Sequence, residues 1–265
     1  MSELLIGTSG YYYKDWVGSF YPQGTREYLA YYQREFHFTE LNFSYYRMPQ
    51  ASALEKMAAQ TSETFQFAIK ATRNMTHETS PQTQGEVQTF VENIQPLVDS
   101  GKLAAVLLQF PFSFHYTVAS RKHLAKLCQA MRDLPLAVEF RNREWQRQSV
   151  YDGLRQLHVC FANVDLPALP GLPTVEKQTT AKLAYIRFHG RNKANWWQGD
   201  NASRYDYHYN ERELGEWVPY IQALRNQSKK VILAFNNHWN AQAIQNARMM
   251  IDLLNIDNRN GSPVT

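Results

Sequence analysis

The chain has 265 residues, enough for one large domain or two small ones, and an eightfold α/β barrel takes about 250 residues. Its hydrophobic fraction of 44% and charged fraction of 20% are typical of a folded soluble domain and argue against intrinsic disorder. The formal net charge of +4 permits an anionic partner. The basic residues are nevertheless too sparse to indicate a dedicated nucleic-acid-binding domain.

Cysteine content and the N-terminal segment bear on location. Cys128 and Cys160 form no Cys-x-x-Cys pair, which argues against a disulfide framework or a cysteine zinc site. Both lie in apolar surroundings and are expected to be buried free thiols. The N-terminal segment lacks the features of a signal peptide, and no apolar run approaches the ~20 residues of a membrane span. We therefore expect a cytoplasmic protein that does not associate with membranes, and favour a monomer.

Eight short apolar runs recur along the chain, each rich in Val, Ile, Phe or Tyr and followed by polar residues, which predicts eight strands. In chain order they are residues 4–7, 38–43, 65–70, 104–110, 136–140, 159–164, 183–188 and 231–235. Helical spacing occupies the intervening stretches 26–36, 51–60, 86–99, 120–132, 149–157 and 211–226, and also 241–254. The sixth crossover, about 174–182, has a weak pattern that predicts a short helix at most.

Alternation of eight strands with helices predicts a parallel sheet, because parallel neighbours require a crossover connection. The competing fold is an open, doubly wound sheet, which usually has a Gly-rich phosphate-binding turn after its first strand. Here the first strand leads into GTSGYYYKDW, which does not match GxGxxG. We therefore predict an α/β fold, a single-domain (β/α)8 TIM barrel over residues 1–254, followed by a flexible polar tail over 255–265.

Polar residues follow every predicted strand, at the end where barrel enzymes place their chemistry. Side chains two residues apart on a strand share a face, so these groups are expected to converge. They are Thr8, Ser9, Glu40, Asn42, Lys70, Gln109, Glu139, Arg141, Asn163, Asp165, Arg187, His189, Asn236, Asn237 and His238. Any one of them is as readily a plain loop residue. A complete ring predicts a pocket, since ionised groups in a barrel mouth are costly unless they pair or bind a ligand.

The carboxylates of this ring have alternative interpretations. Glu40, with Asn42 on the same face, suits a general acid or base, or it forms an ion pair with Lys70. Glu139 and Arg141 are either a structural ion pair or part of a catalytic site. A Schiff-base role for Lys70 would require burial to lower its pKa, and nothing nearby in the sequence argues for that role.

The basic and imidazole groups suggest an anion clamp or a metal site. Arg187 and His189 share a face and could hold an anion, since guanidinium forks onto carboxylate or phosphate. Glu139, Asp165, His189 and His238 are candidate metal ligands of mixed nitrogen and oxygen type. No HExxH or His-x-His spacing supports a metal, although ligands drawn from several strands would leave no local motif. The cofactor is therefore unknown, with a divalent metal as the candidate.

Aromatic residues concentrate in two loops at the same end. Trp196 and Trp197 suggest a platform for a base or a sugar ring, because two adjacent side chains cannot easily both be buried. Tyr205 and Tyr207 of that loop are expected to pack onto the barrel. The first loop adds Tyr11, Tyr12 and Trp16. Basic residues near this end are Lys14, Arg47, Arg73, Arg141, Arg143 and Arg191.

Eight segments together resemble the YecE-like family, a domain of unknown function (family 72). They are IGTSGYYYKDW, ELNFSYYRMP, FQFAIKATRNMTH, LLQFPFSF, AVEFRNREW, YIRFHGR, YDYHYNEREL and FNNHWNAQAIQNA, spanning residues 6–247. The resemblance implies a TIM barrel whose motif residues here are Gly7, Ser9, Glu40, Asn42, Lys70, His77, Gln109, Glu139, Arg141, Arg187, His189, Gly190, Arg191, Asn236, Asn237 and His238. Tyr11 and Phe43 depart from the common pattern. The family resembles sugar-isomerase and abasic-site endonuclease barrels at the level of fold alone.

The leading functional hypothesis is an enzyme acting on an anionic, phosphorylated or nucleotide-like substrate, with phosphoester hydrolysis of the nuclease type as one version. Glu40, Glu139, His189 and His238 are the candidate catalytic residues, with the histidines orienting substrate or moving protons near neutral pH. Candidate substrate-binding residues are Ser9, Asn42, Lys70, Gln109, Arg141, Arg187, Arg191, Trp196, Trp197, Asn236 and Asn237.

Two alternatives stay open. The barrel could bind a nucleic acid or a metabolite without catalysis. It could also be a glycoside hydrolase that uses Glu40 and Glu139. We rank the hydrolase lower, because the two carboxylates are on well-separated strands and Arg141 would keep Glu139 ionised.

Overall fold

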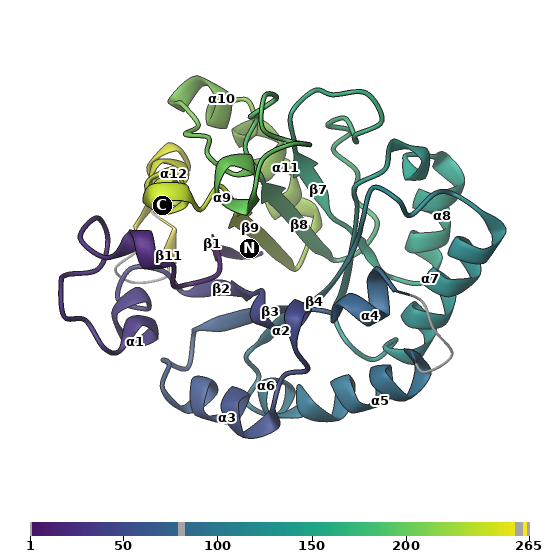
Figure 1. The fold of residues 1–265 in the computed structure, drawn as a ribbon, viewed down its shortest axis with the longest axis horizontal. Coiled ribbons are helices and arrows are strands. Elements are labelled where there is room, and N and C mark those ends of the chain that lie inside the picture. The colour runs from purple at the N-terminus through teal and green to yellow at the C-terminus, as the bar shows by residue number, and fades with distance from the viewer. Residues whose placement is uncertain (1, 79–82, 258–261, 264–265) are drawn as a thin grey trace.

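Nine parallel strands make one sheet that curls into a nearly closed barrel in the computed structural model, which describes residues 2–78, 83–257 and 262–263 (Figure 1). The strand order is β6-β5-β4-β3-β2-β1-β9-β8-β7. The strands are β1 Glu3–Ser9, β2 Phe38–Leu41, β3 Gln66–Lys70, β4 Leu103–Phe110, β5 Leu136–Phe140, β6 Cys160–Phe161, β7 Asn163–Asp165, β8 Leu183–Phe188 and β9 Lys230–Phe235. The predicted α/β TIM barrel is thereby confirmed.

The sixth predicted strand is split into β6 and β7, and the split is where the barrel closes. β6 pairs with β5, with Ala137 opposite Cys160, whereas β7 pairs with β8, with Asn163 opposite Ile186. Ala162, between the two parts, still donates its backbone N–H to Val138 at 2.9 Å. One chain segment thus pairs with each neighbour through a different half, which gives nine strands instead of eight.

Helices surround the barrel (Figure 1). Those described are α1 Tyr28–Tyr32, α2 Phe43–Tyr46, α3 Ala51–Ala59, α4 Arg73–Thr76, α5 Thr83–Asn93, α6 Gln95–Asp99, α7 Val118–Ala130, α8 Gln148–Gln156, α9 Asn201–Arg204, α10 Glu211–Gly215, α11 Val218–Gln227 and α12 Gln242–Leu253. The predicted helices over 86–99 and 211–226 are each divided in two. The crossover at 174–182, which joins β7 to β8, contains no helix.

The second strand is shorter than predicted. β2 ends at Leu41, and Asn42 has helical dihedral angles (φ −97°, ψ −15°) as the residue that precedes α2. Strand alternation therefore stops before Asn42. The early turn brings the α2 segment over the barrel mouth, where its side chains become available to a ligand.

The barrel interior is filled by apolar residues that alternate with the outward-facing ones. Ala68, Leu107, Ala137, Cys160 and Ile232 belong to one buried inner cluster, and their small or branched side chains suit the narrow lumen. A larger buried cluster packs the outer faces of the strands against the helices. Both cysteines are buried and free, as predicted.

The last residues of the chain form a small separate sheet outside the barrel. β10 Ile256–Asp257 pairs with β11 Ser262–Pro263 in the predicted tail, whose residues 258–261 and 264–265 lie outside the described residues. Among the described residues, no helix has the length and apolar character needed to cross a membrane.

Candidate functional site

A cavity of about 640 Å³ lies over the C-terminal ends of the strands. Side chains from β2, β3, β4 and β8 reach it from below, and the loops after β1, β5, β8 and β9 enclose it. Its aromatic lining consists of Tyr11, Tyr12, Tyr13, Phe43, Tyr45, Tyr46, Phe112, Trp196, Trp197 and Tyr205, and its basic lining consists of Lys70, Arg141, Arg187 and Arg204. The cavity is therefore aromatic at its walls and cationic at its floor.

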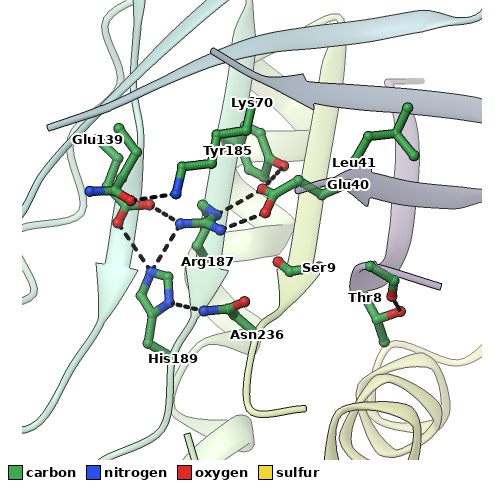
Figure 2. Close-up of polar contacts among 12 residues, drawn as sticks. Thr8, Ser9, Glu40, Leu41, Lys70, Glu139, Tyr185, Arg187, His189 and Asn236 are labelled. Carbon is green, nitrogen blue, oxygen red and sulfur yellow. Dashed lines mark hydrogen bonds and ion pairs between the residues drawn. The ribbon is translucent and has the colours of Figure 1, made fainter. Parts of the chain in front are cut away.

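Arg187 is the centre of a buried ionic network beneath this cavity. Figure 2 shows its guanidinium between the carboxylates of Glu40 and Glu139. It donates from Nε to Glu40 Oε2 at 2.8 Å and from Nη2 to Glu40 Oε1 at 2.5 Å, while Nη1 donates to Glu139 Oε2. The Tyr185 hydroxyl donates to Glu40 Oε2 at 2.6 Å, and Arg141 Nε donates to Glu139 Oε1. Both carboxylates are fully buried and saturated with donors.

The charges of this network determine the ionisation of Glu139. Burial alone would raise the pKa of the Glu139 carboxyl, but the cations of Arg141 and Arg187 outweigh burial and hold that pKa well below its usual range. An ionised Glu139 in turn lets two guanidinium groups be buried side by side.

His189 completes the floor as a neutral imidazole. Burial, together with the nearby cation of Arg141, lowers the pKa of His189 to about 3. Its Nδ1 lies 3.0 Å from Asn236 Nδ2, and its Nε2 lies 3.3 Å from Glu139 Oε1. Nδ1 of the neutral ring accepts from the Asn236 amide, while Nε2 faces both the Glu139 carboxylate and the Arg141 guanidinium, whose Nη2 lies 3.2 Å away.

Lys70 lines the cavity and lies beside the ionic network of Arg187 (Figure 2). Its ammonium nitrogen donates to Gln109 Oε1 at 2.7 Å and lies 4.2 Å from the centre of the Tyr45 ring. Burial, with smaller contributions from the cations of Arg187 and Arg141, lowers the pKa of Lys70 to about 7. This side chain therefore changes its charge in the physiological range.

His238 lies at the opposite wall, stacked on Tyr13. The two rings are 4.2 Å apart and inclined by only 2°. Burial lowers the pKa of His238 to about 4, so the ring is neutral at pH 7. The Tyr13 hydroxyl donates to the backbone carbonyl of Ser9 at 2.7 Å, and the Trp16 ring donates to the carbonyl of His238. These contacts tie the loop after β1 to the loop after β9.

The tryptophan pair divides as the sequence suggested. Trp196 is buried, whereas 49% of the Trp197 surface is exposed, and both line the cavity. Arg141 lies over the Trp196 ring at 5.6 Å. Tyr205 also lines the cavity, which was not expected, while the Tyr207 hydroxyl donates to Glu213 and packs the loop as predicted.

Most of the predicted site residues line this cavity. These are Glu40, Asn42, Lys70, Gln109, Arg141, Arg187, Trp196, Trp197, Asn236 and His238. Glu139 and His189 lie just beneath them in the ionic network. Ser9 is paired in register with Glu40, and its buried hydroxyl has no partner among the described residues. The oxygen Asn42 Oδ1 is likewise buried and unpaired within that part of the chain.

Asp165 and Arg191 were predicted at the mouth, but they lie on the outer face of the barrel. Arg191 donates to both Asp165 oxygens, at 2.8 and 2.7 Å, and Tyr209 and Trp217 donate to the same carboxylate. Asn163, two residues earlier, also faces outward, since it donates to the Gln178 carbonyl. Asn163 and Asp165 therefore share a face of the strand, as predicted, but that face points away from the cavity.

Asn237 is a second correction of the same kind. Its amide donates to the Tyr207 carbonyl at 2.8 Å and to Asn246 Oδ1 at 2.7 Å, and it is absent from the cavity lining. Its contacts fix the loop after β8 against α12.

The candidate metal ligands are not assembled. Asp165 contacts the outer layer, Glu139 and His189 are committed to the two arginines and to Asn236, and His238 is stacked on Tyr13. Across residues 2–78, 83–257 and 262–263, no group of three or more His, Cys, Asp or Glu side chains could hold a metal ion. The predicted metal set therefore does not fit this site.

Several residues of the site were not selected from the sequence: Tyr13, Tyr45, Phe112, Tyr185, Arg204 and Tyr205. Tyr185 had a readable signal, because it precedes Arg187 by two residues and so shares the inward face of β8. The others are on loops, where strand alternation gives no orientation.

The comparisons with known proteins agree with the barrel fold. A family model described as "Protein of unknown function DUF72" matches residues 5–264. The chain belongs to the DUF72 family. A curated relative, the UPF0759 protein YunF of Bacillus subtilis (strain 168), is 33% identical over 277 residues, covering 96% of this chain and 95% of YunF.

Two solved DUF72 structures are similar to this member over almost their whole length. The Thermotoga maritima MSB8 protein TM1631 is 35% identical, with a TM-score of 0.88 over 95% of this chain and 98% of its own. The Enterococcus faecalis V583 protein EF0366 is 25% identical, with a TM-score of 0.87 over 99% of each chain. The barrel is therefore shared with these two members of the family.

Proposed function

We propose that this DUF72 protein is an enzyme that binds a small anionic molecule carrying a ring, of the phosphorylated or nucleotide-like type, in the cavity over its strand ends. The observation that supports this most is the state of the charges at the floor. Glu40 and Glu139 are both occupied by Arg187 and its neighbours, whereas Lys70 and Arg141 reach the cavity. An anionic ligand would meet cations there and no free carboxylate.

Arg141 is the group we assign to the anion. Its Nε is used by Glu139 and its Nη2 lies 3.2 Å from His189 Nε2, while Nη1 has no partner among the described residues. The guanidinium is held from behind by Glu139, which fixes its direction. A preorganised, partly desolvated guanidinium binds a carboxylate or a phosphate well.

The aromatic walls would recognise a flat or ring-shaped part of the ligand. Tyr45 and Phe112 line the cavity, and Trp197 packs edge-on against Phe112 with ring centres 4.8 Å apart. Stacking on such rings contributes about 1–3 kcal/mol per base and tolerates different ring types. This supports a ring-bearing ligand but leaves its identity open.

Lys70 is the group we assign to proton transfer. With pKa values near 3 and 4, His189 and His238 are neutral through the physiological range and are assigned to orientation. Lys70, with a pKa of about 7, exchanges a proton there and faces the cavity. A general acid or base works best when its pKa is near the operating pH.

A non-catalytic nucleic-acid-binding barrel is the second candidate, favoured by aromatic rings exposed at the rim. Tyr46 is 73% exposed, and Tyr12 and Trp197 are also open to solvent. These rings could stack unpaired bases. Glycoside hydrolysis receives no such support, because the Arg187 guanidinium occupies the space between Glu40 and Glu139.

The test is calorimetric titration with adenosine 5′-monophosphate, adenosine and inorganic phosphate. We expect the nucleotide to bind at least tenfold more tightly than adenosine, and Arg141→Gln to remove that preference. Arg143→Gln is the matched control, since this arginine is exposed and outside the cavity lining. Equal affinity for nucleotide and nucleoside in the unmodified protein would refute the anionic ligand. Tighter binding of an oligonucleotide than of the mononucleotide, with no turnover of phosphoesters, would favour the second candidate.

A further inference from the structure

We propose that the Lys70 amine is a nucleophile that forms a Schiff base with an aldehyde or ketone carbon of the ligand. This inference rests on the proposed function, since it concerns the chemistry of the same cavity. It assigns a substrate class, an anionic carbonyl compound, and a covalent role to a lysine otherwise assigned only to proton transfer.

The position of Lys70 meets the first requirement, which is access. It is the last residue of β3, it belongs to the cavity lining, and it keeps part of its surface accessible. Its neighbours are the uncharged amide of Gln109 and the face of Tyr45. A carbonyl group inside the cavity can approach the nitrogen without displacing an ion pair.

The second requirement is that no carboxylate holds the amine as ammonium. Glu40 accepts from Arg187 and Tyr185, and Glu139 accepts from Arg187 and Arg141, so both acids of the floor are occupied. Among the described residues, no carboxylate forms an ion pair with Lys70. The network therefore places two guanidinium cations near Lys70, while both of its carboxylates are bound to other donors and form no ion pair with the amine.

A second buried lysine shows what a structural lysine looks like in this protein. Lys102 Nζ donates to the Ala58 carbonyl at 2.6 Å and to the Thr61 carbonyl and hydroxyl at 2.8 and 3.1 Å. Three acceptors for three protons suit an ammonium. Lys70 has one acceptor, Gln109, and so most of its hydrogen-bonding capacity faces the cavity.

The ionisation of Lys70 is consistent with this role. Burial and the adjacent arginines lower its pKa to about 7, which leaves about half of the amine neutral at pH 7. Only the neutral amine has the lone pair that attacks a carbonyl.

The reaction balances without an added oxidant or reductant. The Lys70 lone pair forms a C–N bond as the carbonyl π bond breaks, and the proton that the nitrogen gives up passes to the carbonyl oxygen to give a neutral carbinolamine. That oxygen then takes one proton from solvent and leaves as water, which gives the protonated imine. Arg141, on the same cavity surface, would hold the anionic group of the substrate while the carbonyl carbon meets Lys70.

The experiment is reductive trapping with pyridoxal 5′-phosphate, which carries a ring, a phosphate and an aldehyde. Protein and reagent are mixed at equimolar concentration, reduced with sodium borohydride, digested, and the labelled lysine located by mass spectrometry. We expect labelling of Lys70 at least tenfold above that of any exposed lysine, with a rate that rises through a midpoint near pH 7. Inorganic phosphate should compete.

Two variants serve as controls. Lys70→Arg keeps the positive charge and should abolish the trapped product, and Lys102→Met should leave trapping at Lys70 unchanged if the fold is intact by circular dichroism. Uniform labelling of surface lysines would overturn the inference.

The failures of the two proposals are distinguishable. Retained nucleotide binding without trapping at Lys70 would overturn only the Schiff base. Trapping by pyridoxal as efficient as by its phosphate would keep the nucleophile and overturn the anionic ligand. Loss of both binding and trapping would overturn both proposals.

Discussion

Two arginine–carboxylate clusters are built on arginines that are close together in the chain, Arg187 and Arg191, and they differ in which charged groups remain available to a ligand. The outer cluster joins Arg191 to Asp165 and closes it with Tyr209 and Trp217. The inner cluster joins Arg187 to Glu40 and Glu139. In the outer cluster the arginine and the carboxylate neutralise each other, whereas the inner cluster borders a cavity and has more cations nearby than carboxylates.

The difference between the clusters helps to separate structural from functional ion pairs in this barrel. In the outer cluster each carboxylate oxygen of Asp165 accepts hydrogen bonds from the chain, and Arg191 also lies within ion-pair distance of Glu213 and Glu216. In the inner cluster the carboxylates have all their hydrogen-bond donors, but Lys70 and Arg141 keep donor groups that have no acceptor among the described residues. A cluster whose cations exceed its anions next to a cavity is the better candidate for a binding site.

The largest effect is expected from Arg187→Met. Removing this guanidinium leaves Glu40 and Glu139 buried with fewer counter-charges, which costs about 3–5 kcal/mol of the free energy of unfolding. Denaturant titration measures the loss. Adding Glu40→Gln to the same chain should recover part of it, and a double variant as unstable as the single one would contradict the proposed charge balance.

Asp165→Asn should have a smaller effect on stability and none on the cavity. Arg191 loses its main partner and one of the Tyr209 and Trp217 donors loses its acceptor, which costs about 2–3 kcal/mol. Affinity for an anionic ligand should stay unchanged in titrations carried out below the melting temperature. Weaker ligand binding in this variant would show that the two clusters are coupled.

The pH dependence of stability should report His189. Its pKa of about 3 in the folded protein is below the ordinary value of 6.5, so the unfolded chain takes up a proton over this range while the folded protein does not. The contribution to stability is therefore complete above pH 6.5 and falls by about 1.4 kcal/mol per pH unit between pH 6.5 and 3. His189→Asn should lack this slope in denaturant titrations between pH 7 and 5, and an identical slope in both proteins would mean that His189 is protonated in the fold.

Lys70→Met is expected to have the smallest effect on stability, a change within about 1 kcal/mol. Lys70 forms no ion pair with a described carboxylate and is repelled by Arg187 and Arg141, so its removal costs little. Thermal unfolding measures this, with Lys102→Met as the contrasting variant because it leaves three buried acceptors unpaired. Equal destabilisation by both substitutions would assign Lys70 a structural role.

Strand periodicity predicted the barrel and most of its floor, because alternation is a property of each strand alone. Glu40, Glu139, Arg187 and His189 were placed on the inward face by this rule. The rule failed for Asp165: it placed Asp165 correctly on the same face as Asn163, but that face points outward and not into the barrel. A shift of one residue exchanges the inward and outward faces of a strand, and the apolar pattern of 159–164 does not determine which face points inward.

The residues of the cavity walls could not be predicted from the sequence for a different reason. Tyr13 and Tyr205 are on loops whose direction depends on contacts with distant segments, such as the stack of Tyr13 on His238. The lowered pKa of Lys70 is also a property of the assembled barrel, since it depends on burial and on the cations of Arg187 and Arg141, which follow or belong to other strands. Composition and spacing contain neither quantity.

The divided strand of β6 and β7 has a consequence for how the molecule opens. Most strands of the barrel are fastened along both edges, but here each half of one short segment is fastened along a single edge. Local opening would begin at such a seam, where the fewest ladder bonds must break together. The amide protons of Ala162 and its neighbours are therefore expected to exchange with solvent deuterium before those of β4 or β9. Leu172 and Trp196, which pack in one apolar cluster with Val164 of β7, also line the cavity.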